Sequence, residues 1–145
     1  MSTTTPSANY AGDLSALEAW ELLKGHAHAR LVDVRTSAEW NFVGLPDVSD
    51  LGHELELVEW QTFPLGQQNP SFVAQLEQAG ADKSAPLLFL CRSGGRSRMA
   101  AIAATAAGFT RAYNIAGGFE GDLDGERHRG HANGWKASGL AWKQT

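Results

Sequence analysis

The chain has 145 residues, the length of one ordinary globular domain, and its hydrophobic fraction of 43% is enough for a buried core. Twelve Lys and Arg against sixteen Asp and Glu leave a formal net charge of −4, which argues against a nucleic-acid or membrane-surface partner. Cys91 is the one cysteine, so an intrachain disulfide and a cysteine-rich metal site are both excluded. Residues 1–10 lack the basic start and the apolar run of a secretory signal, so we expect a cytoplasmic protein.

The predicted elements alternate between strands and helices. Residues 1–12 are interpreted as a flexible lead with a short strand near Tyr10, and residues 13–145 as a single domain. The elements expected after the lead are a helix over 15–25, a strand over 30–34, a helix over 36–42, a strand over 55–60, a helix over 69–80, a strand over 87–90, a helix over 97–107 and a strand over 112–115. This alternation predicts an α/β fold with a mostly parallel, five-stranded central sheet and helices on both faces.

Capping residues mark the expected helix starts. Two pairs have the spacing of a capping box, Ser15 with Glu18 and Thr36 with Glu39. Asn69-Pro70 predicts an N-cap followed by a first-turn proline. Ser97 is predicted to cap the alanine-rich helix that follows the most apolar strand.

Cys91 directly follows residues 87–90, an apolar run without alternation that is typical of a strand covered on both faces. Ligands in open α/β sheets bind beyond the carboxyl ends of the strands. Residues 92–96 contain two glycines, which allow the backbone N–H groups to turn inward as an anion-binding nest, and two arginines. We therefore expect Cys91 to be a largely ionised nucleophile rather than a small buried hydrophobe, the usual role of a lone cysteine.

Loop length separates two cysteine chemistries. Enzymes of the protein-tyrosine-phosphatase class have five residues between the cysteine and the arginine, which encircle a phosphoryl group. Here only four residues separate Cys91 from Arg96, and the next position is Ser97. The shorter loop favours a smaller group, such as one extra sulfur atom on the cysteine.

The segment Cys91–Ser97 resembles the active-site loop of the rhodanese family of sulfurtransferases. The other segments that are similar to the family's signatures are Leu31–Arg35 with Glu39-Trp40, Tyr113–Phe119 and Gly134–Leu140. The resemblance runs from about residue 14 to residue 140. The chain departs from the family pattern in a long connection over 44–69 and a charged insertion over 120–131.

The resemblance implies a thiosulfate sulfurtransferase that works through a persulfide on Cys91. The residues that it assigns to binding the small anionic sulfur donor are Arg92, Ser93, Gly94, Gly95 and Arg96. The acceptor would be cyanide, a thiol or a sulfur-accepting protein, and no metal or organic cofactor is implied. A cysteine-loop phosphatase or arsenate reductase, and a non-enzymatic binding module on the same scaffold, are the alternatives.

Supporting roles are expected for three further residues. Asp33 and Arg35 form either an ion pair that fixes the end of the sheet or a contact that holds the cysteine loop, and the first interpretation is favoured. Ser97 is expected to support the loop as a helix cap. His128 and His131 are interpreted as solvated loop residues, because no third ligand is evident for them.

Overall fold

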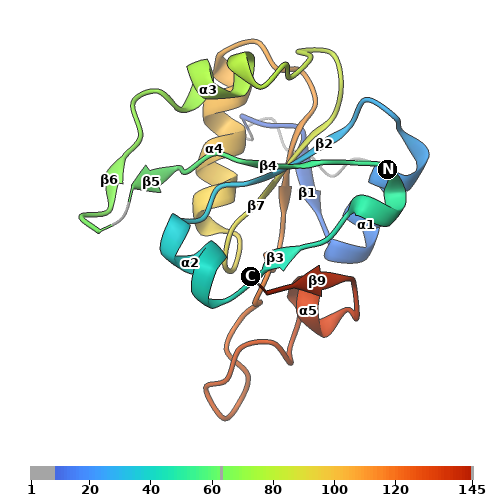
Figure 1. Cartoon of the computed structure of the whole chain (residues 1–145), viewed down its shortest axis with the longest axis vertical. Helices are drawn as coiled ribbons and strands as arrows, with labels where there is room; N and C mark the ends of the chain where they lie inside the picture. The colour runs from blue at the N-terminus through green and yellow to red at the C-terminus, as the bar shows by residue number, and fades with distance from the viewer. Residues whose placement is uncertain (1–8, 63, 145) are drawn as a thin grey trace.

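The computed structural model describes residues 9–62 and 64–144. A central sheet of five strands, all parallel, runs through the molecule (Figure 1). In spatial order its strands are β1 (Gly12–Leu14), β8 (Ala112–Ile115), β7 (Leu87–Leu90), β2 (Arg30–Asp33) and β4 (Leu55–Leu57). The α/β fold predicted from the sequence, with its five-stranded parallel sheet, is confirmed.

Strand β7 lies at the middle of the sheet because both of its faces are apolar. Leu87 and Phe89 pack into a core on one face, and Leu88 and Leu90 pack into a second core on the other. All four residues have no solvent exposure. A parallel strand that is covered on both sides loses the alternation of apolar and polar residues, as the sequence indicated.

Helices cover both faces of the sheet, as predicted. On one face lie α3 (Phe72–Gln78) and α4 (Gly95–Ala106), and on the other lie α1 (Ala16–Gly25) and α5 (Gly134–Ala137) (Figure 1). The capping box of Ser15 and Glu18 is present at the start of α1. No helix among the described residues is long and apolar enough to cross a bilayer.

The long connection between β2 and α3 contains several short elements. They are α2 (Ser37–Phe42), β3 (Leu45–Pro46), a 3-10 helix η1 (Ser49–Leu51), β4, and a hairpin of β5 (Gln61–Thr62) and β6 (Gln67–Gln68). Strand β3 pairs in antiparallel fashion with β9 (Trp142–Lys143) (Figure 1). The second predicted capping box, Thr36 with Glu39, begins α2.

Some predicted boundaries are wrong. The short strand expected near Tyr10 is present but begins two residues later, as β1 at Gly12, and the Ala11 N–H donates to the carbonyl of Ala112. Residues 1–8 of the predicted lead lie outside the described chain. Strand β4 ends at Leu57 rather than at 60. Helix α3 begins at Phe72, and its N-cap is Ser71 rather than Asn69; the Asn69 Oδ1 accepts from the Ser71 N–H, two residues on.

Candidate active site

Cys91 stands one residue beyond β7, at the carboxyl end of the sheet. The residue is 1% exposed, and its Sγ accepts a hydrogen bond of 3.1 Å from the Gly94 N–H. Gly94 has a φ of 113°, a conformation that favours glycine, and it is the N-cap of α4. The sulfur is therefore bound by a loop amide at the positive end of a helix dipole, a place suited to a negative charge.

The other loop residues that the sequence assigned to donor binding lie at different depths. Arg92 and Gly95 are exposed, and Ser93 is half-buried. Arg96 lies in the first turn of α4, and its guanidinium is paired with the carboxylate of Glu39. The loop thus has one exposed guanidinium, on Arg92, and one that is already paired.

Ser97 does not cap the helix, and this prediction is wrong. The left-handed Gly94 allows α4 to begin at Gly95, which places Ser97 inside the first turn. Its buried Oγ lies 3.2 Å from the Cys91 Sγ and 2.6 Å from the Oδ1 of Asn114. Ser97 therefore contacts the cysteine loop through its side chain, which lies against the sulfur itself.

Asn114 and Asp13 complete this hydrogen-bonded chain, and sequence reasoning gave them no role. The Nδ2 of Asn114 donates to the Asp13 carboxylate at 3.0 Å, which leaves its Oδ1 as an acceptor facing Ser97. The single hydroxyl proton of Ser97 therefore has two acceptors, Asn114 Oδ1 and Cys91 Sγ. One signal was present in the sequence: a polar residue inside a buried strand needs a hydrogen-bond partner.

The segment after β8 fixes the backbone of the cysteine loop. The Phe119 N–H donates to the Cys91 carbonyl at 2.8 Å, and the amides of Glu120 and Gly121 both donate to the Arg92 carbonyl, at 3.0 and 3.1 Å. This close approach requires Gly118, because a Cβ atom there would lie 2.4 Å from the Cys91 carbonyl oxygen.

Asp33 and Arg35 form the buried ion pair that the sequence favoured. The Arg35 Nη2 lies 2.6 Å from the Asp33 carboxylate, and both side chains have no exposure. Arg35 also donates to the Gly44 carbonyl and stacks 4.4 Å from the centre of the Phe119 ring. The pair thus fixes the end of β2 and, through Phe119, the support of the Cys91 carbonyl.

Glu39 is a partner of the loop that lies far from it in the sequence. Its two oxygens accept from Nη1 and Nη2 of Arg96, at 2.7 and 2.9 Å. Partial burial alone would raise the pKa of Glu39, but the hydrogen bonds from Arg96 and from the Thr36 amide outweigh it and hold the pKa at about 2. The pair orients Arg96 and ties α2 to α4.

The Glu39→Gln substitution tests this ion pair, because glutamine keeps the capping-box contact to Thr36. Glu39 has a folded pKa of about 2 against an ordinary value of 4.5, so it stabilises the fold above pH 4.5, and this contribution is lost as the pH falls toward 2. We expect the variant to lose about 1–2 kcal/mol of unfolding free energy at pH 7. By pH 3 the difference should shrink to roughly half or less. Urea titrations at the two pH values measure both, and a difference independent of pH would contradict the assignment.

The parallel sheet and the cysteine loop at its carboxyl edge are those of a rhodanese-like protein. The family model described as "STR4 middle domain" matches residues 11–145. The chain belongs to that family.

Two solved structures are similar to the chain in fold. The crystal structure of Rv0390 from M. tuberculosis superposes with a TM-score of 0.86 at 54% sequence identity, over 94% of this chain and 99% of that one. The polysulfide-sulfur transferase homodimer from Wolinella succinogenes has a TM-score of 0.65 at 21% identity, over 95% of this chain and 81% of that one. At that identity the second likeness supports the fold alone.

Two curated proteins are also similar to the chain. The uncharacterized protein RC0915 of Rickettsia conorii is 35% identical over 132 residues, which are 90% of this chain and 96% of that protein. The chloroplastic rhodanese-like domain-containing protein 4 of Arabidopsis thaliana is 30% identical over 129 residues, which are 88% of this chain and 25% of that protein.

Proposed function

We propose that this protein transfers a sulfane sulfur from a small anionic donor such as thiosulfate to cyanide or a thiol, through a persulfide on Cys91. One observation carries the proposal: the Cys91 Sγ is bound by the Gly94 N–H and lies 3.2 Å from the Ser97 hydroxyl, at the start of α4. A sulfur anion at this position gains a hydrogen bond and the helix dipole without a metal ligand or a second thiol.

The reaction has two steps. In the first, the Cys91 thiolate attacks the outer sulfur of thiosulfate; an S–S bond forms, the bond to the sulfonate sulfur breaks, and the electron pair leaves with sulfite. In the second, cyanide or a thiolate attacks the terminal sulfur, takes it away and returns the Cys91 thiolate. Cyanide leaves as thiocyanate and a thiolate leaves as its persulfide, and each product keeps the negative charge of the acceptor.

The two loop arginines have different tasks in this proposal. Arg96 is bound at both of its terminal nitrogens by Glu39, so it shapes the loop and offers little net charge. Arg92 is exposed and suits first contact with a dianionic donor arriving from solvent.

Intact mass spectrometry after incubation with thiosulfate tests the proposal. We expect the chain to gain the mass of one sulfur atom on the peptide that contains Cys91, and cyanide to remove it. Sulfate is the matched control, because it has the same charge and tetrahedral shape but no sulfane sulfur. An unchanged mass, together with hydrolysis of an aryl phosphate, would favour the cysteine-loop phosphatase instead.

Ser97 gives a second test of the same site. When the sulfur is anionic, the Ser97 proton can turn from Asn114 toward Sγ, so Ser97→Ala removes a donor to the charged state. We expect the turnover of thiosulfate to fall about 100-fold. Thr105→Ala is the control, because this hydroxyl lies on the same helix and bonds only the Ala101 carbonyl. Equal turnover in the two variants would show that the hydroxyl does not act on the sulfur.

A further inference from the structure

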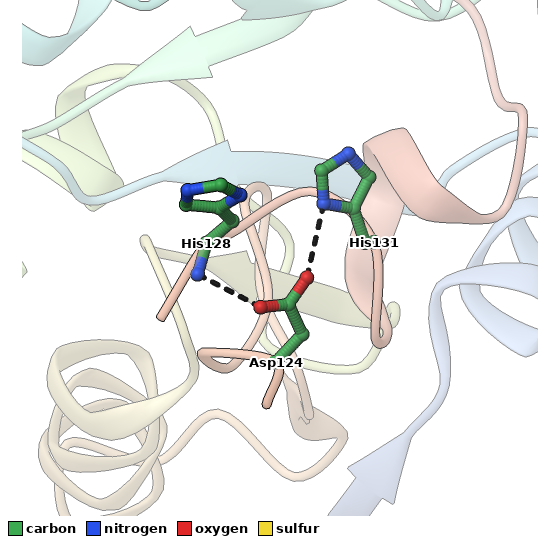
Figure 2. A group of neighbouring side chains, drawn as sticks. All are labelled: Asp124, His128 and His131. Carbon is green, nitrogen blue, oxygen red and sulfur yellow. Dashed lines mark hydrogen bonds and ion pairs between the residues drawn. The ribbon is translucent and has the colours of Figure 1, made fainter. Parts of the chain in front are cut away.

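The charged insertion brings three metal-ligating side chains together outside the active site. Figure 2 shows Asp124, His128 and His131 on one loop, with their side chains facing a common point. Each offers one ligand atom, and these three atoms lie within 4.8 Å of one another. Sequence reasoning left the two histidines without a third ligand, and the fold of the loop supplies it.

Hydrogen bonds orient the carboxylate of Asp124 within the loop. Its Oδ1 accepts from the amides of Glu126 and His128, at 2.8 and 2.9 Å, and its Oδ2 faces His131 Nδ1 at 3.2 Å. One oxygen is thus used by the loop and the other is directed at a histidine nitrogen.

Further bonds hold the loop closed at its base. The Gly130 N–H donates to the Glu120 carbonyl at 2.6 Å, and the Arg129 guanidinium donates to the Gly121 carbonyl at 2.7 Å. Asp122 and Asn133 bond each other twice across the base. A loop ordered in this way loses less conformational entropy when its side chains converge on a ligand.

The separation of the donor atoms fits a metal ion. Zinc bonds to nitrogen and oxygen of about 2.0–2.1 Å imply about 3.3 Å between two ligand atoms of a tetrahedral site. The Asp124 Oδ2 and His131 Nδ1 atoms are hydrogen-bonded at 3.2 Å, so a bound ion would replace the proton between them with little movement of either atom. The ring of His128 is exposed, and its ligand nitrogen lies within 4.8 Å of the ligand atoms of Asp124 and His131.

We propose that Asp124, His128 and His131 bind one divalent transition-metal ion of the zinc class. Two imidazole nitrogens and a carboxylate oxygen suit Zn²⁺, Cu²⁺ and Ni²⁺, and three protein ligands leave a position for water. The ion would fasten a loop that begins at Glu120 and Gly121, whose amides hold the Arg92 carbonyl of the cysteine loop.

Calorimetric titration with Zn²⁺ tests the site. The protein should carry no polyhistidine tag and should have Cys91→Ser, because a thiolate is itself a zinc ligand. We expect one ion per chain, and at least about 100-fold weaker binding in His128→Ala and in His131→Ala. His28→Ala, which removes an exposed histidine elsewhere, should bind as tightly as the parent. The absence of binding, or equal binding in all the variants, would overturn the proposal.

Limited trypsin digestion gives a readout that depends on neither the cysteine nor activity. Arg127 and Arg129 lie between the proposed ligands, so a bound ion should slow cleavage at both. Asp124→Asn is the informative variant, because the amide side chain keeps an oxygen for the two loop amides but presents a poorer zinc ligand. We expect zinc to slow tryptic cleavage of the parent chain at least about tenfold more than cleavage of this variant, because the variant has lost one of the three ligands. Equal protection would exclude Asp124 as a ligand.

Discussion

The Cys91→Ser variant is expected to lose sulfur transfer from thiosulfate by at least about 10⁴-fold, because a serine hydroxyl is a weak nucleophile at neutral pH and cannot carry a sulfane sulfur as a persulfide. The fold should survive, since a hydroxyl oxygen can accept the Gly94 N–H that the Sγ accepts now. Thiocyanate release from thiosulfate and cyanide measures the loss.

Urea unfolding provides the control for this variant. We expect its unfolding free energy to stay within about 2 kcal/mol of the parent value. A folded Cys91→Ser protein that still releases thiocyanate at the parental rate would contradict the proposed nucleophile, whereas an unfolded one would show that Cys91 is needed for the core in which it packs.

Gly118→Ala should strongly destabilise the fold. Its φ is 61°, and the added Cβ would lie 2.4 Å from the Cys91 carbonyl oxygen and 2.6 Å from backbone atoms of Arg92. Backbone cannot rotate away as a side chain can, so the cysteine loop and the segment after β8 must separate. We expect a loss of about 3–5 kcal/mol of unfolding free energy, measured by urea titration.

Gly139→Ala is the matched control for conformation without a clash. Gly139 has a φ of 76°, and a Cβ there would meet nothing within 4 Å. This variant should lose only about 1–2 kcal/mol, the cost of a left-handed residue. If both variants lose the same unfolding free energy, the clash with the cysteine loop adds nothing to the cost of placing alanine in a left-handed conformation.

The features that were predictable from the sequence are local ones. The capping boxes at Ser15 and Thr36 each depend on residues three positions apart, and both are present. The apolar run of β7 carries the signal of a central strand within four residues. The prediction for Ser97 was wrong because Gly94 takes a left-handed conformation that caps the helix three residues earlier.

The supports of the site could not be predicted in this way, because they join distant parts of the chain. Glu39 and Arg96 are 57 positions apart, and Asn114 and Asp13 are 101 apart. Neither pair has a spacing rule that would connect its members, and only the sheet order, with β8 between β1 and β7, brings the second pair to the sulfur.

The bonds from residues 119–121 to the carbonyls of Cys91 and Arg92 have a consequence for the order of events during synthesis. A ribosome releases the chain from its N-terminus, so Cys91 emerges well before Asn114, Gly118 and the amides that clamp its loop. The nascent thiol therefore lacks these supports until the segment after β8 has been made and has docked. The cysteine loop therefore reaches its final backbone conformation only after a segment that lies about 30 residues later in the sequence has docked on it.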